Sequence, residues 1–238
     1  HYQGDPQTEP NAFGGFTPLD KVYSYNPIPA ELNNEQSKYI LGVQANLWTE
    51  YILDFKQVQY MIFPRLMALS EVGWGTSKPE NYKDFENRVV EHFKILDQKN
   101  INYAKSIYNI GGKVIPAKNG VAYELSTSQN ADGIKFTTDG KEPTANSASY
   151  KTAIPVNGKM TVKSAYFENG ILKSAVSVQN FNTSKTTGKN IILENQPSEN
   201  YSFGGAFTLV DGIEGNVKQL GKTWLGFQGK DVVATVDF

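Results

Sequence analysis

The sequence predicts an α/β segment followed by all-β modules. An apolar run too short for a helix, Tyr39–Glu50, precedes a helical pattern over Val58–Trp74, as in a strand that leads into a helix. A second helical pattern covers about Glu80–Lys99. From Lys113 onward the pattern changes to short β-like runs that turn residues separate.

The helical segments carry apolar stripes at helical spacing. Pro64 falls inside the first helical run, so we expect a kink or a break there. Glu71 and Trp74, near its end, are expected to pack and to cap the fold without a chemical role. The second helix repeats its apolar residues every three or four positions, at Tyr82, Phe85, Val89, Phe93 and Leu96.

The segment Tyr2–Asn34 reads as a long loop rich in Gly, Pro, Asn and Tyr. Long loops without regular structure usually bind ligands or cover a site. Asp5 and Glu9 could serve in metal binding or acid/base chemistry. Pro6 and Pro10 beside them favour turns instead, and we prefer that interpretation.

The β-rich part divides into two modules. Asp139-Gly140 and Asn169-Gly170 are hairpin dipeptides between β-like runs, which predicts an antiparallel sandwich. We expect Ile134–Thr138, Thr161–Phe167 and Ile171–Val178 to be strands of this sandwich. The polar stretch 183–189 reads as a linker, so the predicted division is 1–110, 111–182, the linker 183–189, and 190–238.

The amino-acid composition limits the classes of binding partner and cofactor that we expect. The 23 basic and 24 acidic residues are interspersed, so nothing favours nucleic acid or an anionic membrane as a partner. No apolar run approaches the length of a transmembrane helix. The chain lacks cysteine and has only His1 and His92, which excludes thiolate metal sites and argues against a histidine site. We expect no metal and no other cofactor; the oligomeric state is left open.

Trp48 and Glu50 are the candidate site residues. They lie where the predicted strand ends, and parallel α/β barrels bind ligands at the carboxyl ends of their strands. A Trp supplies a flat apolar wall for a sugar ring, and a Glu accepts hydrogen bonds from hydroxyls. The alternative is a buried Trp beside a solvated Glu at the start of a loop.

Three blocks, in order, carry a resemblance to a known family. They are HYQGDPQTEPNAFGGFTPLDKVYSYNP, LGVQANLWTEYI and YMIFPRLMALSEVGWG. Together they resemble the end of the catalytic domain of glycoside hydrolase family 20, the β-N-acetylhexosaminidases, over about Tyr2–Trp74. The resemblance implies that 1–110 holds the last βα unit or units of a (β/α)₈ TIM barrel. It also implies that Trp48 packs against a terminal N-acetylhexosamine and Glu50 accepts hydrogen bonds from its outer hydroxyls.

The family's catalytic Asp-Glu dipeptide occurs nowhere in this chain. Its Tyr-x-Asp pattern would end just before His1, and the chain stops at Phe238 within an apolar alternation. We interpret the chain as an internal fragment of a longer enzyme and expect it to be inactive alone. In the family, the substrate's own acetamido group attacks the anomeric carbon, so the implied reaction is substrate-assisted retaining hydrolysis.

The β-rich part resembles two accessory modules. Residues 134–150, IKFTTDGKEPTANSASY, resemble the sandwich that follows the barrel in bacterial chitobiases and hexosaminidases, where it would buttress the catalytic domain or bind sugar. Residues 190–238 resemble the first half of a discoidin-like, galactose-binding-type sandwich, with Asp211-Gly212 and Trp224 as the main features. Asp211 could belong to a calcium loop, but a tight turn fits better.

Three functions therefore stay open. The chain could be a fragment of an exo-acting β-N-acetylhexosaminidase that acts on glycans, a carbohydrate-binding or adhesion module, or a structural spacer. For the hexosaminidase we expect a periplasmic, cell-surface or secreted location.

Overall fold

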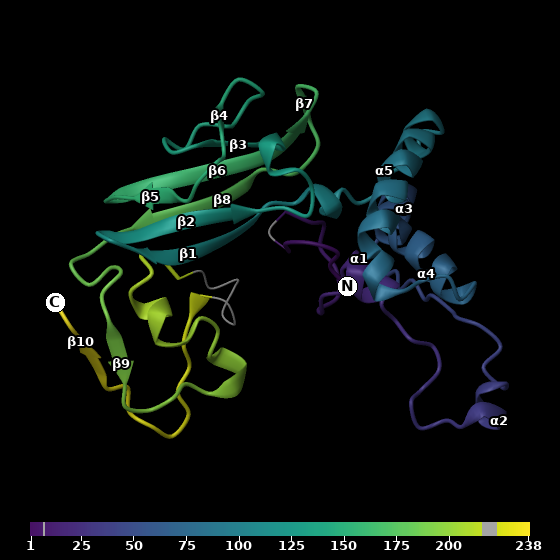
Figure 1. The fold of residues 1–238 in the computed structure, drawn as a ribbon, viewed down its shortest axis with the longest axis horizontal. Helices are drawn as coiled ribbons and strands as arrows, with labels where there is room; N and C mark the ends of the chain where they lie inside the picture. Colours follow the sequence, from purple (N-terminus) through teal and green to yellow (C-terminus); the bar gives the residue numbers. More distant parts are fainter. Residues whose placement is uncertain (7, 216–222) are drawn as a thin grey trace. The chain divides into compact units, whose positions relative to one another are not determined.

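The computed structural model describes residues 1–6, 8–215 and 223–238. The chain forms two compact units, His1–Ile107 and Tyr108–Phe238 (Figure 1). The first is helical and the second is built mainly of antiparallel strands, which confirms the predicted change from α to β structure.

The first unit consists of helices joined by long loops. Its α-helices are α1 (Leu19–Tyr23), α2 (Asn34–Ser37), α3 (Phe55–Ile62), α4 (Arg65–Gly73) and α5 (Tyr82–Gln98), and the 3₁₀ helices are η1 (Pro79–Asn81) and η2 (Ser106–Tyr108), whose last residue begins the second unit. The predicted loop Tyr2–Asn34 is interrupted by α1, and in the N-terminal loop before α1 Tyr2 and Phe16 form an isolated parallel bridge. Both predicted helices are confirmed.

The break in the first predicted helix lies at Phe63-Pro64, between α3 and α4. Proline has no backbone N–H and clashes with the preceding turn, so one helix cannot continue through it. The helix α3 begins at an N-cap: Oδ1 of Asp54 accepts a hydrogen bond from the backbone N of Gln57 at 2.8 Å.

The apolar face of α5 forms much of the core of this unit. Phe85 stacks on Tyr23 with ring centroids 4.5 Å apart, and Phe93 stacks on Tyr103 at 4.0 Å.

The end of α4 differs from the prediction, because Trp74 is 85% exposed and does not pack. Beside it, Glu71 accepts two hydrogen bonds from Arg88, at 2.7 and 2.9 Å.

The predicted strand at Tyr39–Glu50 is wrong for this chain: the described residues contain no strand there. Several of its apolar residues are exposed, with Tyr39 at 83% and Leu41 at 95%. A β-strand needs a neighbouring strand to satisfy its backbone N–H and C=O groups. The sequence pattern is that of a buried strand, but the described part of this unit supplies no partner strand beside it.

The second unit is an antiparallel sandwich followed by a small two-stranded sheet. Its strands are β1 (Gly111–Ala117), β2 (Gly120–Ser126), β3 (Ile134–Thr137), β4 (Ala148–Ser149), β5 (Ile154–Val156), β6 (Lys159–Glu168), β7 (Ile171–Leu172), β8 (Ser177–Asn182), β9 (Ile191–Leu193) and β10 (Ala234–Val236). One sheet has the order β1-β2-β5, and the other has the order β4-β3-β6-β7 with β8 also paired to β6. Short 3₁₀ helices are η3 (Ala131–Gly133), η4 (Glu199–Tyr201) and η5 (Gly205–Leu209).

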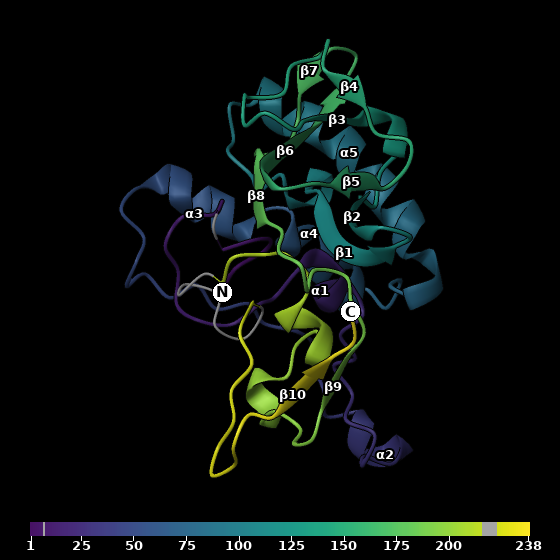
Figure 2. The ribbon, with the colours of Figure 1, turned by 90° about the vertical axis from the view of Figure 1, so that its left-hand side faces the viewer.

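The two sheets of the sandwich pack face to face (Figure 2). Tyr123 of β2 meets Phe181 of β8 edge to face, with ring centroids 5.1 Å apart. Ile134, Val162 and Phe181 are at most 1% exposed. The predicted sandwich is therefore present, and alternating inward residues of both sheets form its core.

The two predicted hairpin dipeptides have different outcomes. Asn169 and Gly170 have φ of +51° and +78° and join β6 to β7 in a tight hairpin, as predicted. Gly140 also has positive φ, but the return strand β4 begins only at Ala148, so Asp139-Gly140 starts a longer loop. The predicted strand Ile171–Val178 is split, because the Ser174 hydroxyl between β7 and β8 accepts a hydrogen bond from Tyr166 N at 2.9 Å.

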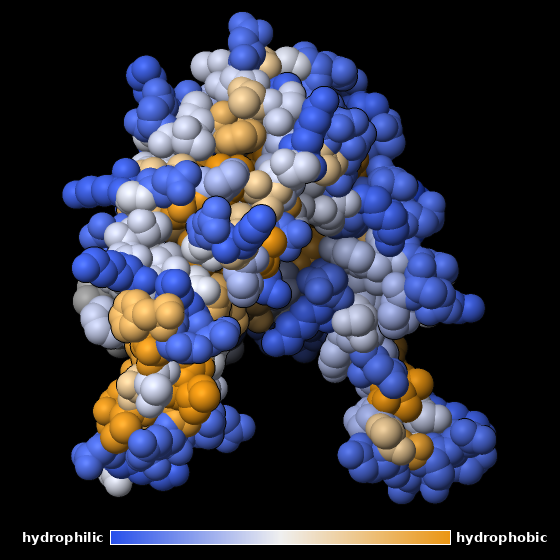
Figure 3. Space-filling model, turned by 60° about the vertical axis from the view of Figure 1, so that its left-hand side comes forward, coloured by the Kyte–Doolittle hydropathy of each residue, from blue (hydrophilic) through white to orange (hydrophobic). Residues whose placement is uncertain are grey.

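The predicted linker 183–189 is hydrogen-bonded to both of its neighbours. Thr183 N donates to Gly158 O at 3.1 Å, and Gly188 N donates to Val210 O at 2.8 Å. Beyond it, β9 and β10 pair over three residues. Many apolar side chains of this last segment are exposed, including Ile192 at 70% and Phe203 at 62%, and Figure 3 shows apolar surface there at lower left.

Asp211 forms the predicted tight turn. Its Oδ1 accepts a hydrogen bond from Ile213 N at 2.7 Å, and the next residue, Gly212, has φ of +78°. Among the described residues, no group of three or more acidic, histidine or cysteine side chains could hold a metal ion. Burial raises the pKa of the Asp211 carboxyl to about 6.

This raised pKa predicts a pH-dependent effect of Asp211→Asn. The folded state binds the proton more tightly than the unfolded chain, where the pKa is about 3.9, so the charge destabilises the fold as the pH rises from about 4 to about 6. The amide can keep the hydrogen bond to Ile213 without a charge. Urea unfolding should show the variant more stable than the wild type at pH 7, with a difference that shrinks below about pH 4. A difference independent of pH would contradict this account.

Candidate functional site

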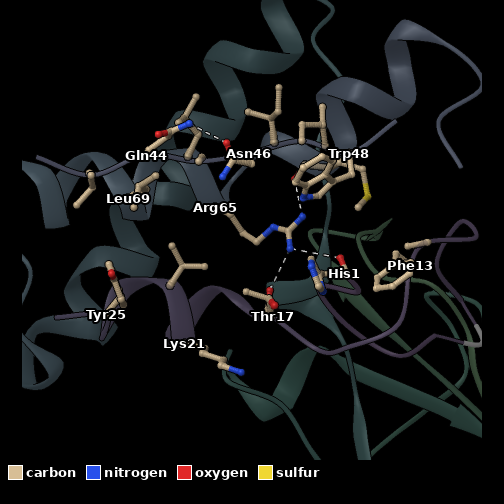
Figure 4. Close-up of a pocket in the computed structure, with 18 of the residues that line it drawn as sticks. His1, Phe13, Thr17, Lys21, Tyr25, Gln44, Asn46, Trp48, Arg65 and Leu69 are labelled. Atoms are coloured by element: carbon tan, nitrogen blue, oxygen red, sulfur yellow. Dashed lines mark hydrogen bonds between the residues drawn. The ribbon is translucent and has the colours of Figure 1, made fainter. Parts of the chain in front are cut away.

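The first unit contains a cavity of about 860 Å³, and Trp48 and Glu50 both line it. Figure 4 shows Trp48 among the lining residues. Its walls come from the N-terminal loop, α1, the segment 40–52, and the facing sides of α3 and α4. Ile40, Val43, Met61 and Leu69 contribute apolar surface. The structure thus brings both predicted site residues to one cavity.

Trp48 is not a core residue in this chain, since the residue is 71% exposed. Phe13, from the N-terminal loop, lines the same cavity and is 59% exposed. Exposed aromatic rings on a concave surface are suited to contact the apolar face of a sugar.

Glu50 lies in a turn that directly follows Trp48. Ile52 N donates a hydrogen bond to Thr49 O at 3.0 Å, so Glu50 is the second residue of a four-residue turn. Its side chain is exposed. A carboxylate at this position accepts hydrogen bonds without the desolvation penalty of a buried charge.

Gln57 of α3 holds this turn from both sides. Its Nε2 donates to Tyr51 O at 2.9 Å and to Asn11 O at 3.4 Å, and its Oε1 accepts from Leu53 N at 2.9 Å. The N-terminal loop and the turn that carries Glu50 are therefore tied to one side chain.

Arg65 joins the start of the chain to the helices. Its guanidinium donates to the carbonyl oxygens of His1 and Thr17, both at 3.3 Å, and of Met61 at 2.6 Å (Figure 4). Burial lowers the pKa of Arg65 from its ordinary value, while the charge of Glu9 opposes that change. Because its donors meet backbone carbonyls, Arg65 serves mainly to fix the cavity wall.

Of the two acids weighed in the N-terminal loop, Asp5 is in a turn and Glu9 is partly buried. Thr8 N donates to Asp5 O at 3.0 Å, in agreement with the predicted turn. Glu9 Oε2 accepts a hydrogen bond from Gln3 N at 2.7 Å, and burial raises the pKa of its carboxyl. Both hydrogen bonds join residues within the N-terminal loop, and we interpret them as structural contacts.

Sequence reasoning missed Gln57 and Arg65. Asp54-x-x-Gln57 matches the pattern of a helix N-cap box, which could have marked Gln57 as a residue with a side-chain partner near the turn. Arg65 lies in one of the quoted blocks, but its three partners are backbone carbonyls, which no sequence pattern reveals. His92 is exposed on α5, away from the core face.

Comparison with known proteins matches part of each unit to a protein family. Residues 1–77 match the catalytic domain of glycosyl hydrolase family 20. Residues 1–77 are a fragment of a family 20 catalytic domain. Residues 117–178 match the chitobiase/beta-hexosaminidase C-terminal domain, so the sandwich belongs to the module type that its sequence resembles. Both family matches end before residue 190, and the discoidin-like resemblance stays a prediction.

Curated relatives agree with the family assignment. A beta-hexosaminidase of Porphyromonas gingivalis is 35% identical over 175 residues, which cover 73% of this chain and 21% of that protein. A beta-N-acetylhexosaminidase of Cellulomonas fimi is 33% identical over 36% of this chain and 17% of its own length. A beta-hexosaminidase of Vibrio furnissii is 38% identical over 28% of this chain and 11% of its own length.

The chain spans about a fifth or less of the length of these relatives. Within the described residues, none of the helices has both the length and the apolar character needed to cross a bilayer.

Proposed function

We propose that this family 20 segment belongs to an exo-acting β-N-acetylhexosaminidase and forms part of its pocket for the terminal sugar. The observation that carries the proposal is that Trp48 and Glu50, in a segment of family 20 type, lie exposed on the wall of one cavity. The substrate would be a glycan that ends in N-acetylhexosamine. The relatives named beta-hexosaminidase support this substrate class.

In this account the two residues bind and orient the sugar. Trp48 packs against the ring, and Glu50 accepts hydrogen bonds from hydroxyls remote from the cleaved bond. Such bonds can strengthen as the sugar distorts toward the transition state, and thereby contribute to catalysis as well as to binding. Proton transfer would come from an Asp-Glu pair outside this chain, with the substrate's acetamido group as nucleophile.

The same proposal accounts for the exposed apolar side chains of 39–53. We propose that Tyr39–Glu50 forms the last strand of the catalytic barrel in the complete enzyme, where it pairs with the preceding strand and the rest of the barrel covers the segment. Leu41, at 95% exposed, and Leu53, at 93%, would then become buried. The sandwich would support the catalytic domain.

Two substitutions in the complete enzyme test the site. Glu50→Gln removes a charged acceptor, and because a hydrogen bond to a charged group contributes about 1.5–3 kcal/mol, kcat/KM should fall about 10–100-fold. Trp48→Ala removes the aromatic wall and should weaken transition-state binding by roughly 1–3 kcal/mol. An aryl N-acetyl-β-glucosaminide gives a direct assay of both variants.

Thermal unfolding of the same preparations is the control. A pocket role predicts a kinetic loss with an unchanged melting temperature. If Trp48 were a core residue of the complete enzyme, its substitution would lower the melting temperature instead. Normal kinetics for Glu50→Gln would overturn the assignment.

A further inference from the structure

The side chain of Gln57 forms hydrogen bonds with two backbone groups at the end of the turn that carries Glu50. Tyr51 O and Leu53 N lie on either side of Ile52, and each is within 2.9 Å of the Gln57 amide. Tyr51 follows Glu50 directly. The orientation of the Glu50 backbone is therefore fixed by a residue that belongs to the next helix.

Only a primary amide of this length meets both demands. The carbonyl of Tyr51 needs a donor, and the N–H of Leu53 needs an acceptor, so one amide orientation serves both. A carboxylate at position 57 keeps the shape but offers only acceptors when ionised, and it would repel the carbonyl oxygen of Tyr51.

The helix that carries Gln57 is itself anchored. The backbone N of Gln57 donates a hydrogen bond to Asp54 Oδ1 at 2.8 Å, and the backbone carbonyl of Lys56, in the same helix, accepts one from Asn102 Nδ2 at 2.9 Å. Gln57 also reaches Asn11 O of the N-terminal loop and lines the cavity with Trp48 and Glu50. The anchored helix α3 therefore restrains, through Gln57, the exposed turn that carries Glu50.

We propose that Gln57 is a positioning residue for sugar recognition, because it holds the turn that presents Glu50 to the cavity. The inference rests on the proposed sugar-binding role of Glu50. Gln57 acts through the backbone of Tyr51 and Leu53 and need not touch the substrate. Losing it leaves Glu50 chemically intact but free to leave its productive orientation.

A double-mutant cycle in the complete enzyme tests this coupling. Gln57→Glu should lower kcat/KM about fivefold to tenfold, the effect of losing one or two ordinary hydrogen bonds. In a Glu50→Gln background, whose hydroxyl contact is already weakened, the same change should lower kcat/KM less than about twofold. The matched control is Gln59→Ala, which removes a glutamine of the same helix that bonds to Asn102 rather than to the turn. It should leave kcat/KM within about twofold of the wild type.

The outcomes separate this inference from the proposed function. If Glu50→Gln alone has normal kinetics, the sugar-binding role of Glu50 fails and Gln57 has nothing to position. If Glu50→Gln is impaired while Gln57→Glu lowers kcat/KM equally in both backgrounds, or not at all, the role of Gln57 is overturned. Should Gln57→Glu lower the melting temperature, Gln57→Met, which also loses the polar contacts, provides a second variant for the same cycle. Non-additivity with Glu50→Gln is again the supporting result, and additivity again overturns the role.

Discussion

The 238-residue chain on its own is expected to release no phenol from an aryl N-acetyl-β-glucosaminide. The proposed reaction needs an acid for the leaving oxygen and a carboxylate that orients the acetamido group, and an Asp-Glu pair would supply both. No Asp-Glu dipeptide occurs in the chain. In the proposed site, Trp48 and Glu50 bind and orient the sugar, and proton transfer is assigned to neither of them.

The assay compares the purified chain with a buffer blank and with the complete enzyme at the same molar concentration. The complete enzyme should turn over, whereas the chain should match the blank. Turnover by the chain above the blank would mean that its own residues provide the acid and the stabilising carboxylate, and the division of roles proposed for this site would be wrong.

The substitution Phe181→Ala in the sandwich is expected to cause a large loss of stability. Phe181 is 1% exposed and lies edge to face with Tyr123 across the two sheets. Truncating a buried Phe to Ala typically lowers the free energy of unfolding by about 3–5 kcal/mol, because transfer energy is lost and a cavity remains. Urea unfolding followed by far-UV circular dichroism measures the change in the β-rich transition.

Val178→Ala is the matched control for this substitution. Val178 lies on the same strand, β8, but is 43% exposed, so its truncation should change the free energy of unfolding by less than about 1 kcal/mol. An equal decrease in the free energy of unfolding for the two variants would mean that the Tyr123–Phe181 contact is not at the centre of this core.

The sequence predicted the elements whose signals are local. Pro64 indicated the break between α3 and α4, and Asn169-Gly170 indicated the hairpin between β6 and β7. Both depend on backbone preferences within a few residues. The apolar spacing of α5 likewise identified Phe85 and Phe93 as core residues.

Predictions that depend on distant partners were less successful. The segment 39–50 has the composition of a strand, but pairing requires a neighbour, and the described residues form no strand there. Ser174 separates β7 from β8 through a hydrogen bond to Tyr166, which the β-like run did not reveal. Trp74 has the composition of a core residue yet lies on the surface.

The candidate site was predicted only in part, because some of its contacts also join residues that are distant in the sequence. Trp48 and Glu50 were identified from the sequence, and both line the cavity. The contacts that fix their surroundings run from Gln57 to Tyr51 and Asn11, and from Arg65 to His1 and Thr17. These partners are backbone carbonyls, which every residue possesses, so no residue type marks them in advance.

The central claim is that Trp48 and Glu50 hold the terminal sugar, and a crystal structure of the complete enzyme with N-acetylglucosamine bound tests it most directly. The account predicts the sugar ring against the indole of Trp48 and a Glu50 carboxylate oxygen within about 2.5–3.2 Å of a ring hydroxyl. A sugar bound in the catalytic domain with neither residue in contact would contradict it.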